Sequence, residues 1–83
     1  MKIIQSQIKG VFTLEPQIFQ DERGYFMESY NDKSFSRISG LNISFVQDNE
    51  SKSNKDVLRG LHFQIPPYAQ DKLVRVIKGS VLD

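Results

Sequence analysis

The chain contains no cysteine, which excludes disulfides and thiolate-bound metal as sources of stability. The two charge signs nearly balance, since eleven basic residues against ten acidic ones give a net charge of +1, so no overall charge indicates a nucleic-acid or membrane-surface partner. No apolar run approaches the length of a membrane span, and Gln5, Ser6 and Gln7 interrupt the start before a signal-peptide core can form. These absences predict a soluble cytoplasmic chain, in which any anion site is local.

The length of 83 residues allows at most one domain, near the small end of what buries a self-sufficient core. The last residues, GSVLD, follow a turn signal and read as the beginning of another strand. A sheet that ended there would have an unpaired edge, which proteins usually shield. We therefore expect residues 1–83 to form a single partial domain, or a chain that needs a partner.

Short segments rich in β-branched and aromatic residues dominate the sequence, with turn signals such as Asp21 to Gly24 between them. Pro16 divides the first of these segments into two extended pieces, and residues 50–56 form a polar loop that needs no function beyond connecting strands. The expected strand-like segments span residues 10–19, 25–30, 42–49, 57–65 and 72–83. This pattern predicts an all-β sandwich or barrel.

One short helix is expected near residues 32–39, with Asp32 as its N-terminal cap and Gly40 as its C-terminal stop. Phe35 and Ile38 lie one turn apart on its apolar side. Other aromatic residues are expected in the core, where such side chains dominate in small proteins, although one or two could instead stack on a base or sugar. These expected core residues are Phe19, Tyr25, Phe26 and Phe63.

His62 is the only histidine and lies in the apolar segment VLRGLHFQ. It can be interpreted as a core or rim residue whose ring is hydrogen-bonded to the backbone. Alternatively, Arg59 and Lys72 bring cations near a neutral imidazole that acts as a general base. A metal site is poorly supported, because Glu28 or Asp48 would have to converge on this single histidine from other strands.

Arg23, Arg59 and Lys72 each stand at the start of a strand or in the turn before one, where side chains at the mouth of a barrel reach a ligand. Guanidinium groups suit bidentate contact with phosphate, although each cation alone is also explained as a solvated surface charge. Gln47 and Asn49 flank Asp48, and these amides either read a pyrimidine edge or cap a turn. Serine-nucleophile motifs and glycine-rich phosphate loops are absent.

The strings DERGYFMESYN and FVQDNESKSNKDVLRGLHFQIPPYAQDKLVRVIKGSVLD together resemble the N-terminal half of the dTDP-4-dehydrorhamnose 3,5-epimerases of dTDP-L-rhamnose biosynthesis. The resemblance covers nearly the whole chain. It implies the N-terminal portion of a cupin-type jelly-roll barrel that works as a homodimer, with strands shared between two chains that contribute to each other's sites. It also implies a dTDP-4-keto-6-deoxy sugar as substrate, with no metal and no organic cofactor.

Carried over by position, the resemblance implies that His62 is the base that removes a proton next to the C4 ketone, and that Lys72 lies near the ketone oxygen. Arg23 and Arg59 match arginines that hold the substrate at its diphosphate. The remaining substrate-contacting positions are Glu28, Gln47, Asp48, Asn49, and Phe19 or Phe26 against the thymine. Protons at C3 and C5 are acidic only because C4 is a ketone, so epimerisation needs a base, an electrophile at the oxygen and an opposing acid.

The family continues for about as many residues again, a size closer to an ordinary domain. That part holds the family's tyrosine acid, a second histidine and the aspartate that orients the catalytic one. Without that part, the alternative function is a non-catalytic remnant that binds a nucleotide sugar. A related dTDP-sugar 3-epimerase or ketoisomerase is a further alternative. Because Arg59 and His62 are three residues apart, an ideal strand would place them on opposite faces. Either Gly60 interrupts the strand, or Arg59 lies at the rim before regular pairing begins.

Overall fold

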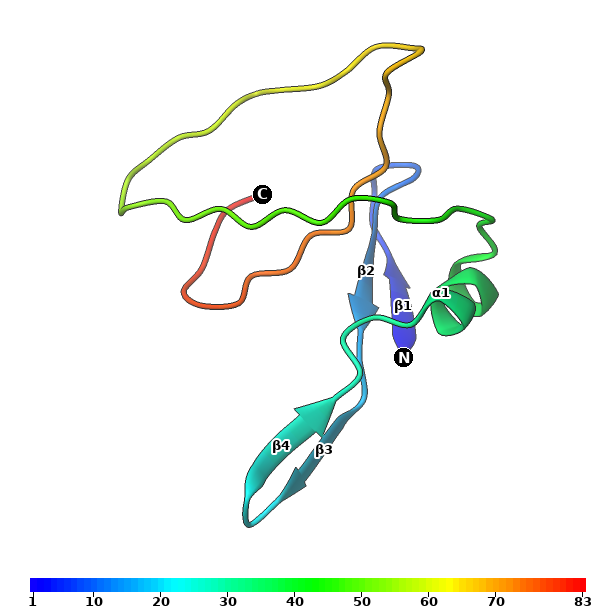
Figure 1. Cartoon of the computed structure of the whole chain (residues 1–83), viewed down its shortest axis with the longest axis vertical. Helices are drawn as coiled ribbons and strands as arrows, with labels where there is room; N and C mark the ends of the chain where they lie inside the picture. Colours follow the sequence, from blue (N-terminus) through cyan, green and yellow to red (C-terminus); the bar gives the residue numbers. More distant parts are fainter. The chain divides into compact units, whose positions relative to one another are not determined.

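The computed structural model describes residues 1–83, which divide into two compact units, Met1–Asn49 and Glu50–Asp83. Its helix and strands all belong to the first unit (Figure 1). In chain order they are β1 (Lys2–Gln5), β2 (Phe12–Glu15), β3 (Ile18–Asp21), β4 (Gly24–Met27) and α1 (Asp32–Ser39). No helix has the length and apolar character that crossing a bilayer requires.

The four strands form two antiparallel hairpins. β1 pairs with β2, with Ile3 opposite Leu14, and β3 pairs with β4, with Phe19 opposite Phe26. Pro16 lies between β2 and β3 and cannot donate a ladder hydrogen bond, so the predicted break in residues 10–19 is confirmed. The β1 strand was not expected from the sequence.

Both ends of α1 are set by local capping. The side-chain oxygen of Asn31 accepts a hydrogen bond from the Ser34 N–H at 3.0 Å. Asn31 is therefore the N-terminal cap, and the prediction of Asp32 is wrong by one residue. Asp32 lies instead in the first turn, where its charge complements the helix dipole. Gly40 adopts φ 71° and donates to the Ser36 carbonyl at 3.0 Å, which confirms the predicted stop.

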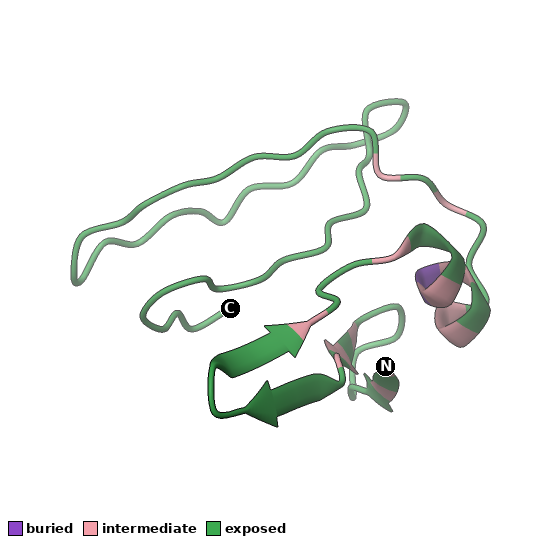
Figure 2. Ribbon diagram, turned by 60° about the horizontal axis from the view of Figure 1, so that its bottom comes forward, coloured by how far each residue is buried: buried purple, intermediate pink, exposed green.

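The core of the first unit is a cluster of aromatic rings around Phe35. Phe35 is 2% exposed and is the buried residue on α1 in Figure 2. Its ring centroid lies 5.4 Å from that of Phe45, 6.0 Å from that of Tyr30 and 6.5 Å from that of Phe12. Phe45 also meets Tyr30 edge to face at 5.7 Å. This cluster ties β2, α1 and the segments on either side of the helix together.

The aromatic residues that were expected in the core are exposed instead, so that prediction is wrong. Phe19 and Phe26 are 55% and 69% exposed, because the β3–β4 hairpin contacts no other helix or strand. Tyr25 shares that hairpin, and Phe63 lies in the second unit, where every side chain is exposed. A side chain on a lone hairpin has no second layer against which to pack.

The segments 42–49, 57–65 and 72–83 do not form hydrogen-bonded strands, contrary to prediction. Within the second unit the backbone hydrogen bonds are local, from Val57 N to the Asn54 carbonyl and from Tyr68 N to the Ile65 carbonyl. Strands require a ladder partner, and these segments have none in the chain. The alternation expected in 42–49 still holds where Ile43 and Phe45 are half-buried.

Candidate active site

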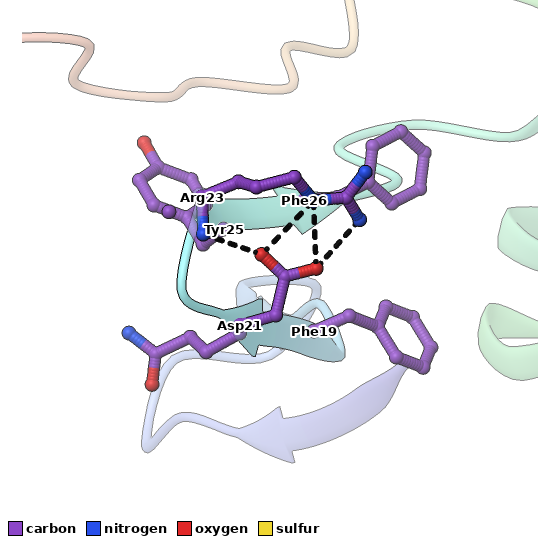
Figure 3. A pocket seen from close by; sticks show the side chains of 7 residues that line it. Phe19, Asp21, Arg23, Tyr25 and Phe26 are labelled. Carbon is purple, nitrogen blue, oxygen red and sulfur yellow. Dashed lines mark hydrogen bonds and ion pairs between the residues drawn. The ribbon is translucent and has the colours of Figure 1, made fainter.

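The β3–β4 hairpin carries an open hollow of about 520 Å³. The tight turn between the strands brings their ends together, and the register places Phe19 beside Phe26 (Figure 3). Three of the predicted substrate-binding residues therefore meet here: Phe19, Arg23 and Phe26. The complete lining is Phe19, Gln20, Asp21, Arg23, Gly24, Tyr25 and Phe26.

Asp21 holds Arg23 across the turn, as the dashed lines of Figure 3 show. Its Oδ1 accepts the Arg23 backbone N–H at 2.8 Å, and its Oδ2 accepts Nε at 3.1 Å and Nη2 at 2.6 Å. The hydrogen bonds from the Arg23 side chain, and then from its backbone, lower the pKa of Asp21. The same pairing raises the pKa of Arg23. No signal in the sequence marks Asp21 as a residue of this hollow, because an aspartate at this position is fully explained as part of the turn.

A second hollow, of about 300 Å³, lies within the second unit and brings His62 and Lys72 to one surface. The loop after Ile65 turns back through a hydrogen bond from Tyr68 N to the Ile65 carbonyl at 2.8 Å. The complete lining is His62, Phe63, Gln64, Ala69, Gln70 and Lys72. The two residues with predicted catalytic roles thus line the same hollow, together with two amide and two apolar side chains.

Gly60 separates Arg59 from His62 by a backbone conformation that strands do not contain. Its φ is 107°, a region that favours glycine, and a Cβ there would lie 3.3 Å from the His62 backbone nitrogen. The Arg59 guanidinium donates to Ser53 Oγ and to the Lys52 carbonyl, both at 2.7 Å. Residues of the polar loop 50–56 therefore hold the side chain of an arginine that was predicted to bind substrate.

The other predicted substrate contacts do not line either hollow. Gln47 Nε2 donates to Asn49 Oδ1 at 3.3 Å, two residues beyond the anchoring ring of Phe45. Asp48 between them is exposed, as is Glu28, which follows the end of β4.

Tyr30 in the cluster donates its hydroxyl to Asp32 at 3.1 Å. Partial burial, followed by this hydrogen bond, raises the pKa of Tyr30. No three His, Cys, Asp or Glu side chains converge in a way that could hold a metal ion.

Comparisons with known proteins agree with one another. The family model described as dTDP-4-dehydrorhamnose 3,5-epimerase matches residues 5–83. Proteins of that name from Shigella flexneri and Escherichia coli K12 are each 55% identical over all 83 residues, which are 46% and 45% of their lengths. The crystal structure of dTDP-4-dehydrorhamnose 3,5-epimerase from Elizabethkingia anophelis matches 83% of this chain and 38% of its own, with a TM-score of 0.76 and 52% identity.

These matches confirm the predicted fold class, an all-β barrel of the cupin type with one short helix, of which this chain forms a part. The chain spans less than half the length of the curated relatives named above.

Proposed function

The chain belongs to the dTDP-4-dehydrorhamnose 3,5-epimerase family, and from that premise we propose that it converts dTDP-4-dehydro-6-deoxy-D-glucose to dTDP-4-dehydro-L-rhamnose. The observation that carries the proposal is the placement of His62 and Lys72 around one hollow. A base and a cation on one surface are what proton removal beside a ketone requires. The volume of the hollow, about 300 Å³, is at the lower end for small-molecule sites.

In this proposal His62 removes the proton from C3, and then from C5, of the sugar. The electron pair of the broken C–H bond moves toward C4, and the negative charge gathers on the ketone oxygen. Lys72 donates a hydrogen bond to that oxygen as the charge develops, which stabilises the enolate more than the ketone. Delivery of a proton to the opposite face completes the inversion at each carbon and requires a separate acid.

The hairpin hollow supports a role in holding the nucleotide. Arg23 offers a charged fork suited to phosphate oxygens, and Phe19 and Phe26 are exposed aromatic surfaces in the same hollow, one of which packs on the thymine. Arg59, held by its own loop, is proposed as a second ligand of the diphosphate. Further substrate contacts are proposed for Glu28, Gln47, Asp48 and Asn49.

We also propose that residues 1–83 form one partial domain and act as a homodimer with shared strands, in the cytoplasm. The family match runs through both compact units without a break, which supports a single domain. Leu58, Leu61 and Phe63 are 89%, 104% and 85% exposed, in a segment without a ladder partner. Apolar surface and unpaired backbone of this kind favour pairing with another chain.

Incubation with dTDP-4-dehydro-6-deoxy-D-glucose in heavy water tests the proposed reaction. We expect deuterium to enter at C3 and C5, because each enolisation exchanges one carbon-bound proton with solvent. Proton NMR measures this exchange as the loss of the C3 and C5 proton signals. The control is dTDP-glucose, which lacks the ketone and should take up no deuterium. Binding without exchange would instead show a non-catalytic sugar-nucleotide module, and exchange at C3 alone would show a 3-epimerase.

Replacing Lys72 by alanine should lower kcat by about 10²–10³-fold, the usual effect of removing one oxyanion-stabilising donor. The matched control is Lys78→Ala, which removes the same charge from an exposed side chain outside the hollow. Steady-state epimerisation rates measure both variants. Equal rates for the two variants would show that Lys72 acts only as a surface charge.

A further inference from the structure

We propose that Asp21 is a positioning residue for the substrate diphosphate, because it holds the Arg23 guanidinium with its outer edge toward the ligand. The inference deepens the proposed function, on which it rests, and assigns a role to a side chain that contacts no substrate itself.

The hydrogen bonds between Asp21 and Arg23 leave one edge of the Arg23 guanidinium free. An arginine carries five N–H donors in a rigid plane. Asp21 accepts from Nε and Nη2, so both Nη1 protons and the second Nη2 proton stay available. Nη1 and Nη2 together form an edge that matches two oxygens of a phosphate. The Arg23 side chain is 86% exposed, so a ligand can reach this edge.

The Asp21 carboxylate also fixes the position of the Arg23 backbone, from which the guanidinium side chain extends. Its Oδ1 accepts the Arg23 backbone N–H at 2.8 Å, while the strand register places Asp21 opposite Gly24 at the end of the hairpin. One side chain thus joins the backbone and the guanidinium of the same arginine. A long side chain that is ordered before binding loses less conformational entropy when the ligand arrives.

Repulsion between Asp21 and a phosphate opposes this benefit. The two anions would contact different edges of the guanidinium, in a hollow that is open to water, where a high dielectric constant and dissolved salt weaken their interaction. Water and salt do not weaken the entropic benefit of an ordered Arg23 side chain in this way. We therefore expect removal of Asp21 to weaken nucleotide binding, although it removes a negative charge from an anion site.

A double-mutant cycle on the full chain tests the proposal, with dTDP as the probe and calorimetry as the measurement. Asp21→Ala should weaken dTDP binding by about fivefold, within the range for coupled neighbours. In an Arg23→Ala background the same change should alter affinity by less than about twofold. Asp21→Asn keeps an oxygen for the backbone N–H, so the hairpin turn is preserved, and it should also bind dTDP more weakly than the unaltered protein.

Glu22→Gln is the matched control, because Glu22 is an exposed residue of the same turn that does not line the hollow, and the affinity of this variant for dTDP should equal that of the unaltered protein. The proposal is overturned if Asp21→Ala and Asp21→Asn both bind dTDP as tightly as the unaltered protein. It is also overturned if Asp21→Ala costs the same in both backgrounds, which would indicate a general effect on the turn. If Arg23→Ala itself has no effect, the assignment of Arg23 to the diphosphate fails as well.

Discussion

Replacing His62 by alanine is expected to reduce deuterium exchange at C3 and C5 by about 10²–10⁴-fold, the usual contribution of a general base. Without the imidazole, no side chain of the hollow in the second unit has a neutral nitrogen that readily accepts a proton, since Gln64 and Gln70 are amides. NMR exchange rates in heavy water measure the effect. Affinity for dTDP should change little, because the nucleotide is assigned to other residues.

Added imidazole distinguishes a chemical role of His62 from a structural one. If the ring acts as a base, free imidazole should restore part of the exchange in His62→Ala, because the small molecule can occupy the vacated space. A ring that served only as a rim residue, hydrogen-bonded to the backbone, would leave exchange in the variant at the level of the unaltered protein. That result would remove the catalytic assignment while leaving family membership untouched.

Replacing Phe35 by alanine should lower the free energy of unfolding by about 3–5 kcal/mol, the usual cost for a buried phenylalanine. Phe35 is 2% exposed and meets the rings of Phe12, Tyr30 and Phe45. The loss is a large part of the roughly 5–15 kcal/mol that stabilises a typical domain. Chemical denaturation followed by tyrosine fluorescence measures the change.

Val46→Ala is the control for the Phe35 variant. Val46 follows Phe45 directly but is 93% exposed, so its truncation should change the free energy of unfolding by less than about 0.5 kcal/mol. A comparable loss from both substitutions would mean that the aromatic cluster is not a packed core.

The roles expected for Arg23, His62 and Lys72 came from the family resemblance, because residue type alone left His62 open as a core or rim residue. The structure brings His62 and Lys72 to one hollow. The pairing of Asp21 with Arg23 was not predicted, because the turn alone is a sufficient reason for an aspartate at this position. This pairing became visible only in three dimensions.

The family, the break at Pro16 and the helix stop at Gly40 follow from the order of the residues alone. Such breaks and stops depend on a missing N–H or an allowed positive φ, within a few residues of the chain. The burial of Phe35, the exposure of Phe19 and the lack of ladder partners in the segment 57–65 are visible only in three dimensions. Burial and strand pairing depend on neighbours from distant parts of a chain, or from another chain, which no local pattern contains.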